Sequence, residues 1–181
     1  MAAYLYFFLL FFTLFIIIFV TIAMQWSERN IKVNKPQYQK NFIVRIQFAK
    51  SRELLKDMIN SVTDRGRDAL GFNLGIDYAF MIGLYGFLAL FSFMLTKNHP
   101  NESRESIGRV ASMLMIVPLI ADIFENYCLG RWCFDKEWQG PFKIYYLATR
   151  VKWIVAIAVG IFCLVSLMLN IISFQRLFIA F

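Results

Sequence analysis

Four long apolar runs constrain this chain more than any other feature of its sequence. A helix that crosses a hydrocarbon core needs about 20 consecutive, mostly apolar residues. Runs of this kind occur at Tyr4–Met24, Ile76–Leu95, Ile107–Leu129 and Leu147–Ile172. Hydrophobic residues make up 59% of the 181 residues, more than a soluble core of this size buries. We therefore predict an all-α fold, a four-helix transmembrane bundle that forms one membrane domain over residues 1–181.

The first run could also be interpreted as a secretory signal. It has no basic segment before it, its apolar stretch is too long, and no small-residue cleavage motif precedes Trp26. We therefore interpret Tyr4–Met24 as the first span. The last run exceeds the minimum length and resumes after Arg176, so we expect it to tilt or to continue along the membrane interface.

Basic residues gather between spans one and two and between spans three and four. The first group is Arg29, Lys32, Lys35, Lys40, Arg45, Lys50, Arg52, Lys56, Arg65 and Arg67; the second is Arg131, Lys136, Lys143, Arg150 and Lys152. The opposite side carries Lys97, Arg104, Arg109 and Arg176. The positive-inside rule then predicts cytoplasmic basic segments with both chain ends outside, and we expect a multi-pass protein of a bacterial inner membrane.

The net charge of +7 is interpreted as a feature of the membrane surface. Basic side chains beside anionic lipid headgroups contribute about 1 kcal/mol each. No aromatic–basic recognition motif accompanies these charges, so nucleic-acid binding is not expected. The expected partners are the lipid bilayer, its anionic headgroups, and other membrane subunits or a second copy of the chain.

The segment between spans one and two is basic, and it also has the residue pattern of an amphipathic helix. After Pro36, residues 41–63 place apolar side chains at helical spacing with charged side chains opposite them. The apolar positions are Val44, Phe48, Leu55, Ile59 and Val62. We predict one amphipathic cytoplasmic helix here, lying on the membrane or over the ends of the spans.

A D-x-x-E-N element interrupts the third apolar run. Asp122, Glu125 and Asn126 fall on one side of a helix, within about 6 Å along its axis. Asp77 is expected in the first turn of span two, at the same membrane face, because spans two and three form a hairpin. A carboxylate near the middle of a membrane helix costs roughly 2.5 to 3.5 kcal/mol, so these groups need a compensating partner.

Three kinds of partner fit this acidic cluster. A shared proton would make it a proton carrier or general acid. A hard divalent metal would suit the carboxylate oxygens of Asp122 and Glu125. Ion pairs with Arg131, Arg150 or Lys152 would make the cluster a structural clasp between helices. The sequence leaves the three open and indicates no particular cofactor.

Neighbouring residues in spans two and three could shape such a site. Pro118 leaves the Leu114 carbonyl without its helical donor, which favours a kink beside Asp122. Gly83 and Gly86 allow close helix approach. Tyr78 and Tyr85 are expected to offer hydroxyl groups to the same hairpin.

Cysteine and histidine usage excludes several chemistries. Cys128 and Cys133 form a C-x4-C pair without other zinc ligands, and Cys163 lies within span four. His99, the one histidine, belongs to the loop on the opposite side. Histidine-rich di-iron sites, His-ligated haem and a Ser-His-Asp triad are therefore excluded within a single chain.

Two stretches resemble a known group of proteins. Gly75-Ile-Asp-Tyr-Ala-Phe80, and Leu119-Ile-Ala-Asp-Ile-Phe-Glu-Asn126 with its D-x-x-E-N, resemble a family of small four-span bacterial membrane proteins without an assigned activity. The resemblance covers roughly residues 46–129 and implies a four-helix membrane bundle. It implies no catalytic role for any residue.

Three functional classes follow. The cluster could be an ion, proton or small-ligand site, or the chain could be an accessory subunit of a larger membrane complex. It could also be a membrane-surface adaptor that acts through its basic segment. We favour the intramembrane acidic site, with the accessory subunit as the alternative. Whether the protein is an enzyme is left open.

Overall fold

The computed structural model describes residues 2–97, 101–135 and 137–179. Over these ranges the chain is helical and contains no strand, apart from one isolated bridge between Val33 and Val62. The helices are α1 (Ala2–Asn30), α2 (Pro36–Gln39), α3 (Phe42–Gln47), α4 (Arg52–Asn60), α5 (Asp64–Thr96), α6 (Glu102–Leu114), α7 (Ile116–Phe134) and α8 (Phe142–Ile179). The all-α class expected from the sequence is confirmed.

Four helical segments are long and apolar enough to cross a membrane. They are Tyr4–Asn30, Asp64–Thr96, Glu102–Phe134 and Phe142–Ile171. Each extends past the apolar run that predicted it, because polar ends continue the helix after the hydrophobic residues stop. At 33 residues, α5 is about 50 Å long, against about 30 Å for a hydrocarbon core. This is the architecture of a multi-pass membrane protein.

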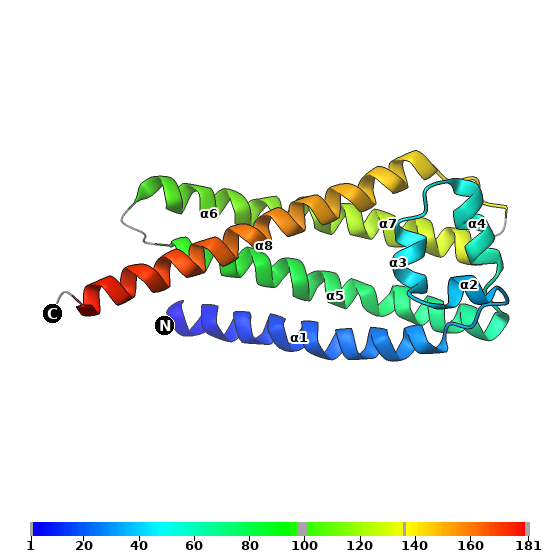
Figure 1. Cartoon of the computed structure of the whole chain (residues 1–181), viewed down its shortest axis with the longest axis horizontal. Coiled ribbons are helices and arrows are strands. Elements are labelled where there is room, and N and C mark those ends of the chain that lie inside the picture. Colours follow the sequence, from blue (N-terminus) through cyan, green and yellow to red (C-terminus); the bar gives the residue numbers. More distant parts are fainter. Residues whose placement is uncertain (1, 98–100, 136, 180–181) are drawn as a thin grey trace.

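Helix α5 is the centre of the bundle, with α1, α6, α7 and α8 packed against it. Figure 1 shows α1 running antiparallel to α5, and the start of α1 and the end of α8 at the same end of the molecule. The short helices α2, α3 and α4 lie at the other end, where α7 turns into α8. We call this second end the loop end.

Helix α1 packs on α5 through a small residue and leaves an aromatic face uncovered. A Cβ atom on Gly83 would lie 2.9 Å from Ile16 Cγ2, so a larger side chain there would force the two helices apart. On the opposite face of α1, Phe8 stacks on Phe12 and Phe15 on Phe19. These rings are largely exposed in the isolated chain, as expected for a surface that faces lipid.

The prediction of one amphipathic helix over residues 41–63 is wrong. The segment folds as α3 and α4, separated at Phe48–Ser51. Ser51 begins a new helix because its hydroxyl accepts a hydrogen bond from Leu54 N at 3.1 Å, and such caps compete with a continuous helix. Of the five predicted apolar positions, Leu55, Ile59 and Val62 are buried, whereas Val44 and Phe48 are 53% and 40% exposed.

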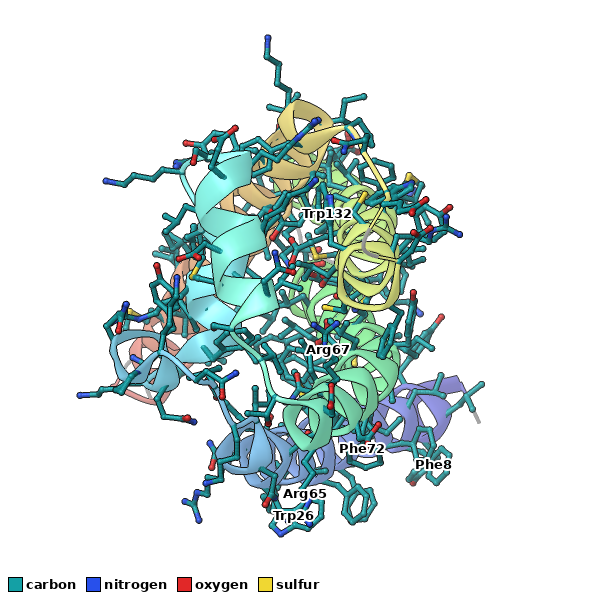
Figure 2. All side chains as sticks on the ribbon, turned by 90° about the vertical axis from the view of Figure 1, so that its right-hand side faces the viewer. Phe8, Trp26, Arg65, Arg67, Phe72 and Trp132 are labelled. Carbon is teal, nitrogen blue, oxygen red and sulfur yellow. The ribbon has the colours of Figure 1, made fainter. Side chains whose placement is uncertain are left out.

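A packed core joins the loop end to the ends of α5, α7 and α8. Trp132 and Tyr145 contact edge to face at a centroid distance of 5.1 Å within a cluster of buried side chains. The Tyr145 hydroxyl donates to the Ile46 carbonyl at 2.8 Å, tying α3 to α8. Viewed from the loop end, Trp132 and Arg67 point into the bundle while Trp26 and Phe72 point away from it (Figure 2). Arg67 Nη1 donates to the Cys133 carbonyl at 2.7 Å, which joins α5 to α7.

The third span is broken as Pro118 predicts. Helix α6 ends at Leu114 and α7 begins at Ile116. Proline has no N–H to donate to the carbonyl four residues earlier, so the ladder is interrupted at Leu114. Met115 N instead donates to Ser112 O at 3.3 Å, a tighter turn. The third span is therefore one helical segment with a local irregularity at Met115, where α6 passes into α7.

Candidate functional site

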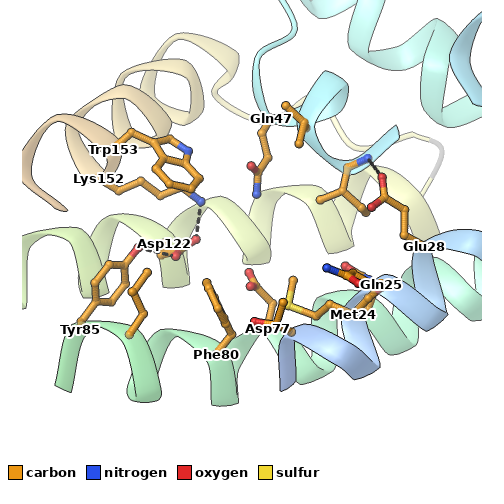
Figure 3. Close-up of a pocket in the computed structure, with 15 residues that line it drawn as sticks. Met24, Gln25, Glu28, Gln47, Asp77, Phe80, Tyr85, Asp122, Lys152 and Trp153 are labelled. Carbon is orange, nitrogen blue, oxygen red and sulfur yellow. Dashed lines mark hydrogen bonds and ion pairs between the residues drawn. The ribbon is translucent and has the colours of Figure 1, made fainter. Parts of the chain in front are cut away.

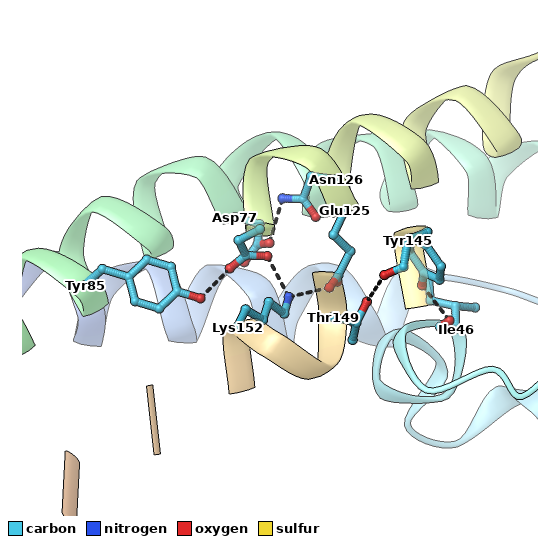
Figure 4. Close-up of polar contacts among 9 residues, drawn as sticks. Ile46, Asp77, Tyr85, Glu125, Asn126, Tyr145, Thr149 and Lys152 are labelled. Atoms are coloured by element: carbon cyan, nitrogen blue, oxygen red, sulfur yellow. Dashed lines mark hydrogen bonds and ion pairs between the residues drawn. The ribbon is translucent and has the colours of Figure 1, made fainter. Parts of the chain in front are cut away.

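Lys152 of α8 lies between two carboxylates of α7. Its Nζ atom is 2.6 Å from Asp122 Oδ1 and 2.9 Å from Glu125 Oε2 (Figure 4). The three side chains are 3%, 5% and 0% exposed. One ammonium group thus neutralises part of the charge of two carboxylates inside the bundle, where an unpaired charge is costly.

Asp122 is also held from α5. The Tyr85 hydroxyl donates to Asp122 Oδ2 at 2.7 Å. Asp122 therefore accepts one hydrogen bond on each oxygen, from Tyr85 on one side and from Lys152 on the other. This arrangement links α5, α7 and α8 through one carboxylate.

Asp77 belongs to the same cluster but has a different partner. Its Oδ2 atom accepts a hydrogen bond from Asn126 Nδ2 at 2.7 Å, and its side chain is buried. No cation makes an ion pair with it among the described residues. Asp77 lies roughly three and a half turns into α5 rather than in the first turn, because Thr63 caps the helix by accepting from Gly66 N.

The structure therefore brings Asp77, Asp122, Glu125 and Asn126 together from two neighbouring helices, with Lys152 from a third. Two buried acceptors in this group have no hydrogen-bond partner in the described part of the chain: Glu125 Oε1 and Asn126 Oδ1. Buried acceptors without donors are unfavourable. The cluster is thus short of donors and of positive charge.

Two of the three expected cations lie elsewhere. Arg131 pairs with Asp135 one turn along α7, at 2.6 Å. Arg150 lies over the Tyr146 ring, with its guanidinium carbon 4.3 Å from the ring centroid. Both arginines are exposed, because they fall on the faces of α7 and α8 that turn away from the acidic cluster.

Of the residues expected beside the cluster, some lie next to it and others do not. Tyr85 contacts Asp122 directly, and Pro118 is buried one turn before it. Tyr78 is 42% exposed and makes no hydrogen bond to the cluster among the described residues. Tyr78 follows Asp77 directly, and a step of one residue turns the side chain about 100° around the helix.

A cavity of about 230 Å³ adjoins the acidic cluster. Asp77, Asp122 and Tyr85 form its inner part, α1 and α3 close one side, and α8 closes the other (Figure 3). The full lining is Thr21, Met24, Gln25, Glu28, Ile43, Val44, Gln47, Asn73, Asp77, Phe80, Leu84, Tyr85, Asp122, Lys152 and Trp153. Carboxylates, amides and aromatic rings thus face one space.

Helices α1 and α3 also contribute to this cavity, which was not predicted from the sequence. Gln25 and Glu28 stand three residues apart at the end of the first apolar run, a spacing that places both on one helix face. That spacing could have indicated that both side chains face the same space. Gln47 carried no signal, because its position depends on how α3 folds back over the bundle.

The cluster is not arranged as a metal site. Among the residues that the structure describes, no group of three or more His, Cys, Asp or Glu side chains is placed to hold a metal ion. Lys152 Nζ occupies the position between Asp122 and Glu125 that a divalent ion bound by both would need. Cys128, Cys133 and Cys163 are buried free thiols.

Comparisons with family models, curated proteins and solved structures find no match to this chain. The resemblance of the Asp77 and D-x-x-E-N stretches to small four-span bacterial membrane proteins therefore stays a prediction. The geometry of the cluster and its cavity is the basis on which a function can be proposed.

Proposed function

We propose that this chain is an integral protein of a bacterial inner membrane whose buried acidic site takes up a proton or a small cationic ligand at Asp77. One observation carries the proposal. Lys152 is shared by Asp122 and Glu125, whereas Asp77 has a neutral amide as its partner and lines the cavity.

The charge balance gives the physical reason. Three carboxyl groups and one ammonium group meet in surroundings of low dielectric constant. Excess negative charge there is stabilised by a proton or by a cation that enters from the cavity. Asp77 is the natural acceptor, because the other two carboxylates already share Lys152.

The ion pairs of Lys152 assign a second role within the same cluster. Asp122, Glu125 and Lys152 hold α7 against α8, so these residues act as the clasp and Asp77 as the exchangeable position. In this proposal the cluster is both a structural clasp and a binding site, and different residues serve the two functions.

For orientation, we propose that the loop end faces the cytoplasm and that both chain ends lie outside. The basic residues of the two connecting segments support this, since positive charge accumulates on cytoplasmic sides. In this orientation α3 and α4 lie beside anionic headgroups at the cytoplasmic surface.

Infrared titration in lipid nanodiscs tests the proton site. The carbonyl-stretch band of protonated carboxyl groups is followed against pH for the wild type and for Asp77→Asn. We expect the variant to lose one titrating component while it still purifies as a folded protein. Asp68→Asn, which removes an exposed carboxyl from the same helix, serves as the control. Identical titrations for Asp77→Asn and the wild type would remove the proposal.

The alternative function is that of an accessory subunit in a larger membrane assembly. The stacked, uncovered Phe side chains of α1 favour it, since another membrane helix could cover them as well as lipid does. Purification in a mild detergent distinguishes the two: a stoichiometric companion supports the subunit function, and a chain that purifies without one contradicts it.

A further inference from the structure

We propose that the cavity binds an amphipathic organic cation, an ammonium group carried on an apolar body, with its positive charge against Asp77. This inference rests on the proposed function and names the ligand class of the same site. It comes from three properties of the cavity: its charge, its aromatic lining and the position of its mouth.

The charge of the lining selects a cation. Three carboxylates, Glu28, Asp77 and Asp122, face one ammonium group, that of Lys152. Lys152 is already divided between Asp122 and Glu125, and Glu125 lies just outside the lining. Within the described part of the chain, Glu28 Oε1 accepts one hydrogen bond, a long one of 3.4 Å from Ile43 N. A ligand that enters the cavity therefore meets uncompensated negative charge.

The aromatic and apolar residues select an organic rather than an inorganic cation. Phe80 lies between Asp77 and Tyr85 on the α5 side of the cavity, and Trp153 lies across from it on α8 (Figure 3). Aromatic faces attract ammonium groups that have lost their water of hydration. Apolar walls, in contrast, offer no oxygen ligands to replace the hydration shell of a metal ion. An alkylated ammonium ion satisfies both the rings and Asp77.

The mouth of the cavity favours an amphiphile. Gln25 on α1 and Val44 on α3 are its exposed lining residues, whereas Asp77, Tyr85 and Asp122 are buried. Trp26, next to Gln25, is 64% exposed, as is typical of side chains at the lipid–water interface. A volume of about 230 Å³ holds a headgroup but no whole lipid. The ligand's apolar part would therefore remain at the interface.

Direct binding tests this assignment. Benzyltrimethylammonium is titrated into the full-length protein in phosphatidylglycerol nanodiscs and followed by calorimetry, for the wild type, Asp77→Asn and Asp68→Asn. We expect Asp77→Asn to weaken binding by about tenfold or more, since a charge-assisted contact is lost, and Asp68→Asn to bind like the wild type. Equal binding by Asp77→Asn and the wild type would overturn the proposal.

Two further measurements keep the test decisive if Asp77→Asn folds poorly. Phe80→Leu retains an apolar wall but removes the ring, and we expect affinity to fall about two- to fivefold. A neutral ligand of the same shape, neopentylbenzene, should bind far more weakly than the ammonium ion. Equal affinity for the charged and neutral ligands would contradict a site selected by charge.

The ammonium group could come from a lipid headgroup or from a free amine. Adding phosphatidylethanolamine to the nanodiscs separates these sources: competition with benzyltrimethylammonium assigns the site to a lipid headgroup, and its absence assigns it to free cations. Failure of this inference can be told from failure of the proposed function. A cavity that binds no organic cation, while Asp77 still titrates in the infrared experiment, removes only the ligand class.

Discussion

The same three residue types, Lys, Asp and Tyr, meet at two places in this molecule, one buried in the bundle and one exposed at its end. Inside the bundle, Asp122 accepts from Lys152 at 2.6 Å and from Tyr85 at 2.7 Å. At the loop end, Asp57 accepts from Lys35 at 2.5 Å and from Tyr38 at 2.8 Å.

The surroundings distinguish the two groups. The buried ion pair is 3% and 5% exposed, whereas the Lys35 and Asp57 side chains are 44% and 43% exposed. In water each partner of a broken pair is solvated again, but inside the bundle it is left as an isolated charge. Similar hydrogen-bond geometry therefore predicts a large loss of stability when the buried group is broken and a small one when the exposed group is broken.

The largest effect is expected from Lys152→Met. This change leaves Asp122 and Glu125 buried without their shared cation, which typically costs about 3 to 5 kcal/mol. Thermal unfolding in detergent, followed by circular dichroism, should show a large fall in stability. Lys143→Met, which removes an exposed lysine from the start of the same helix, should change little.

Replacing the two carboxylates by neutral amides tests whether the effect of Lys152→Met comes from charge. In the triple variant Lys152→Met, Asp122→Asn, Glu125→Gln, positions 122 and 125 no longer carry buried charges without their shared cation, so we expect much of the lost stability to return. A triple variant no more stable than Lys152→Met would mean that packing of the lysine side chain, and not its charge, holds α7 against α8.

An intermediate effect is expected from Tyr85→Phe. The change removes the hydroxyl that donates to Asp122 and keeps the ring, so the loss should be about 0.6 to 2 kcal/mol. Chemical denaturation measures it. Tyr78→Phe is the matched control, because Tyr78 lies on the same helix with its side chain 42% exposed. If both substitutions cost the same, the Tyr85–Asp122 hydrogen bond contributes nothing.

The smallest effect is expected at Lys35 and Asp57, and it should depend on pH and salt. The hydrogen bond from Lys35, followed by that from Tyr38, holds the pKa of Asp57 below its ordinary value of 3.8. The hydrogen bond to Asp57 raises the pKa of Lys35 above 10.5. The contribution of Asp57 is complete above pH 3.8 and is lost as the pH falls through the lowered pKa. That of Lys35 is complete below pH 10.5 and is lost as the pH rises through the raised pKa.

Comparing the melting temperatures of the wild type and Asp57→Asn across this range checks the sign. We expect a small difference that is constant near neutral pH, shrinks below pH 3.8, and shrinks in high salt because exposed charges are screened. A difference that grows on acidification would contradict the direction given for Asp57.

The sequence predicted most of the fold because spans depend on local composition. Twenty apolar residues in a row have few alternatives to a membrane helix, so the four spans could be located. The kink also followed from a single residue, Pro118, whose missing N–H acts on its own helix. The loop between α1 and α5 could not be predicted in this way, since the Ser51 cap competed with an equally plausible continuous helix.

For the candidate site, the acidic residues could be predicted from the sequence, whereas their cationic partner and the cavity could not. The hairpin of spans two and three required Asp77 to lie near Asp122 and Glu125, and helical spacing placed Asn126 beside them. Helical spacing could not choose among Arg131, Arg150 and Lys152, because the choice depends on how α8 is rotated against α7. The cavity required still more: the approach of α1 and the fold of α3, which no pattern within one helix encodes.

The break at Met115 divides the third span into a part that carries the acidic cluster and a part that does not. Helix α7 is fixed through Lys152, Tyr85 and the aromatic core at the loop end. Helix α6 is held by different contacts: Gly108 lies against Thr96 of α5, and Arg104 Nη2 donates to Asn170 Oδ1 of α8 at 3.4 Å. A substitution that weakens the packing of α6 on α5 is therefore expected to leave the spacing of the carboxylates on α7 unchanged.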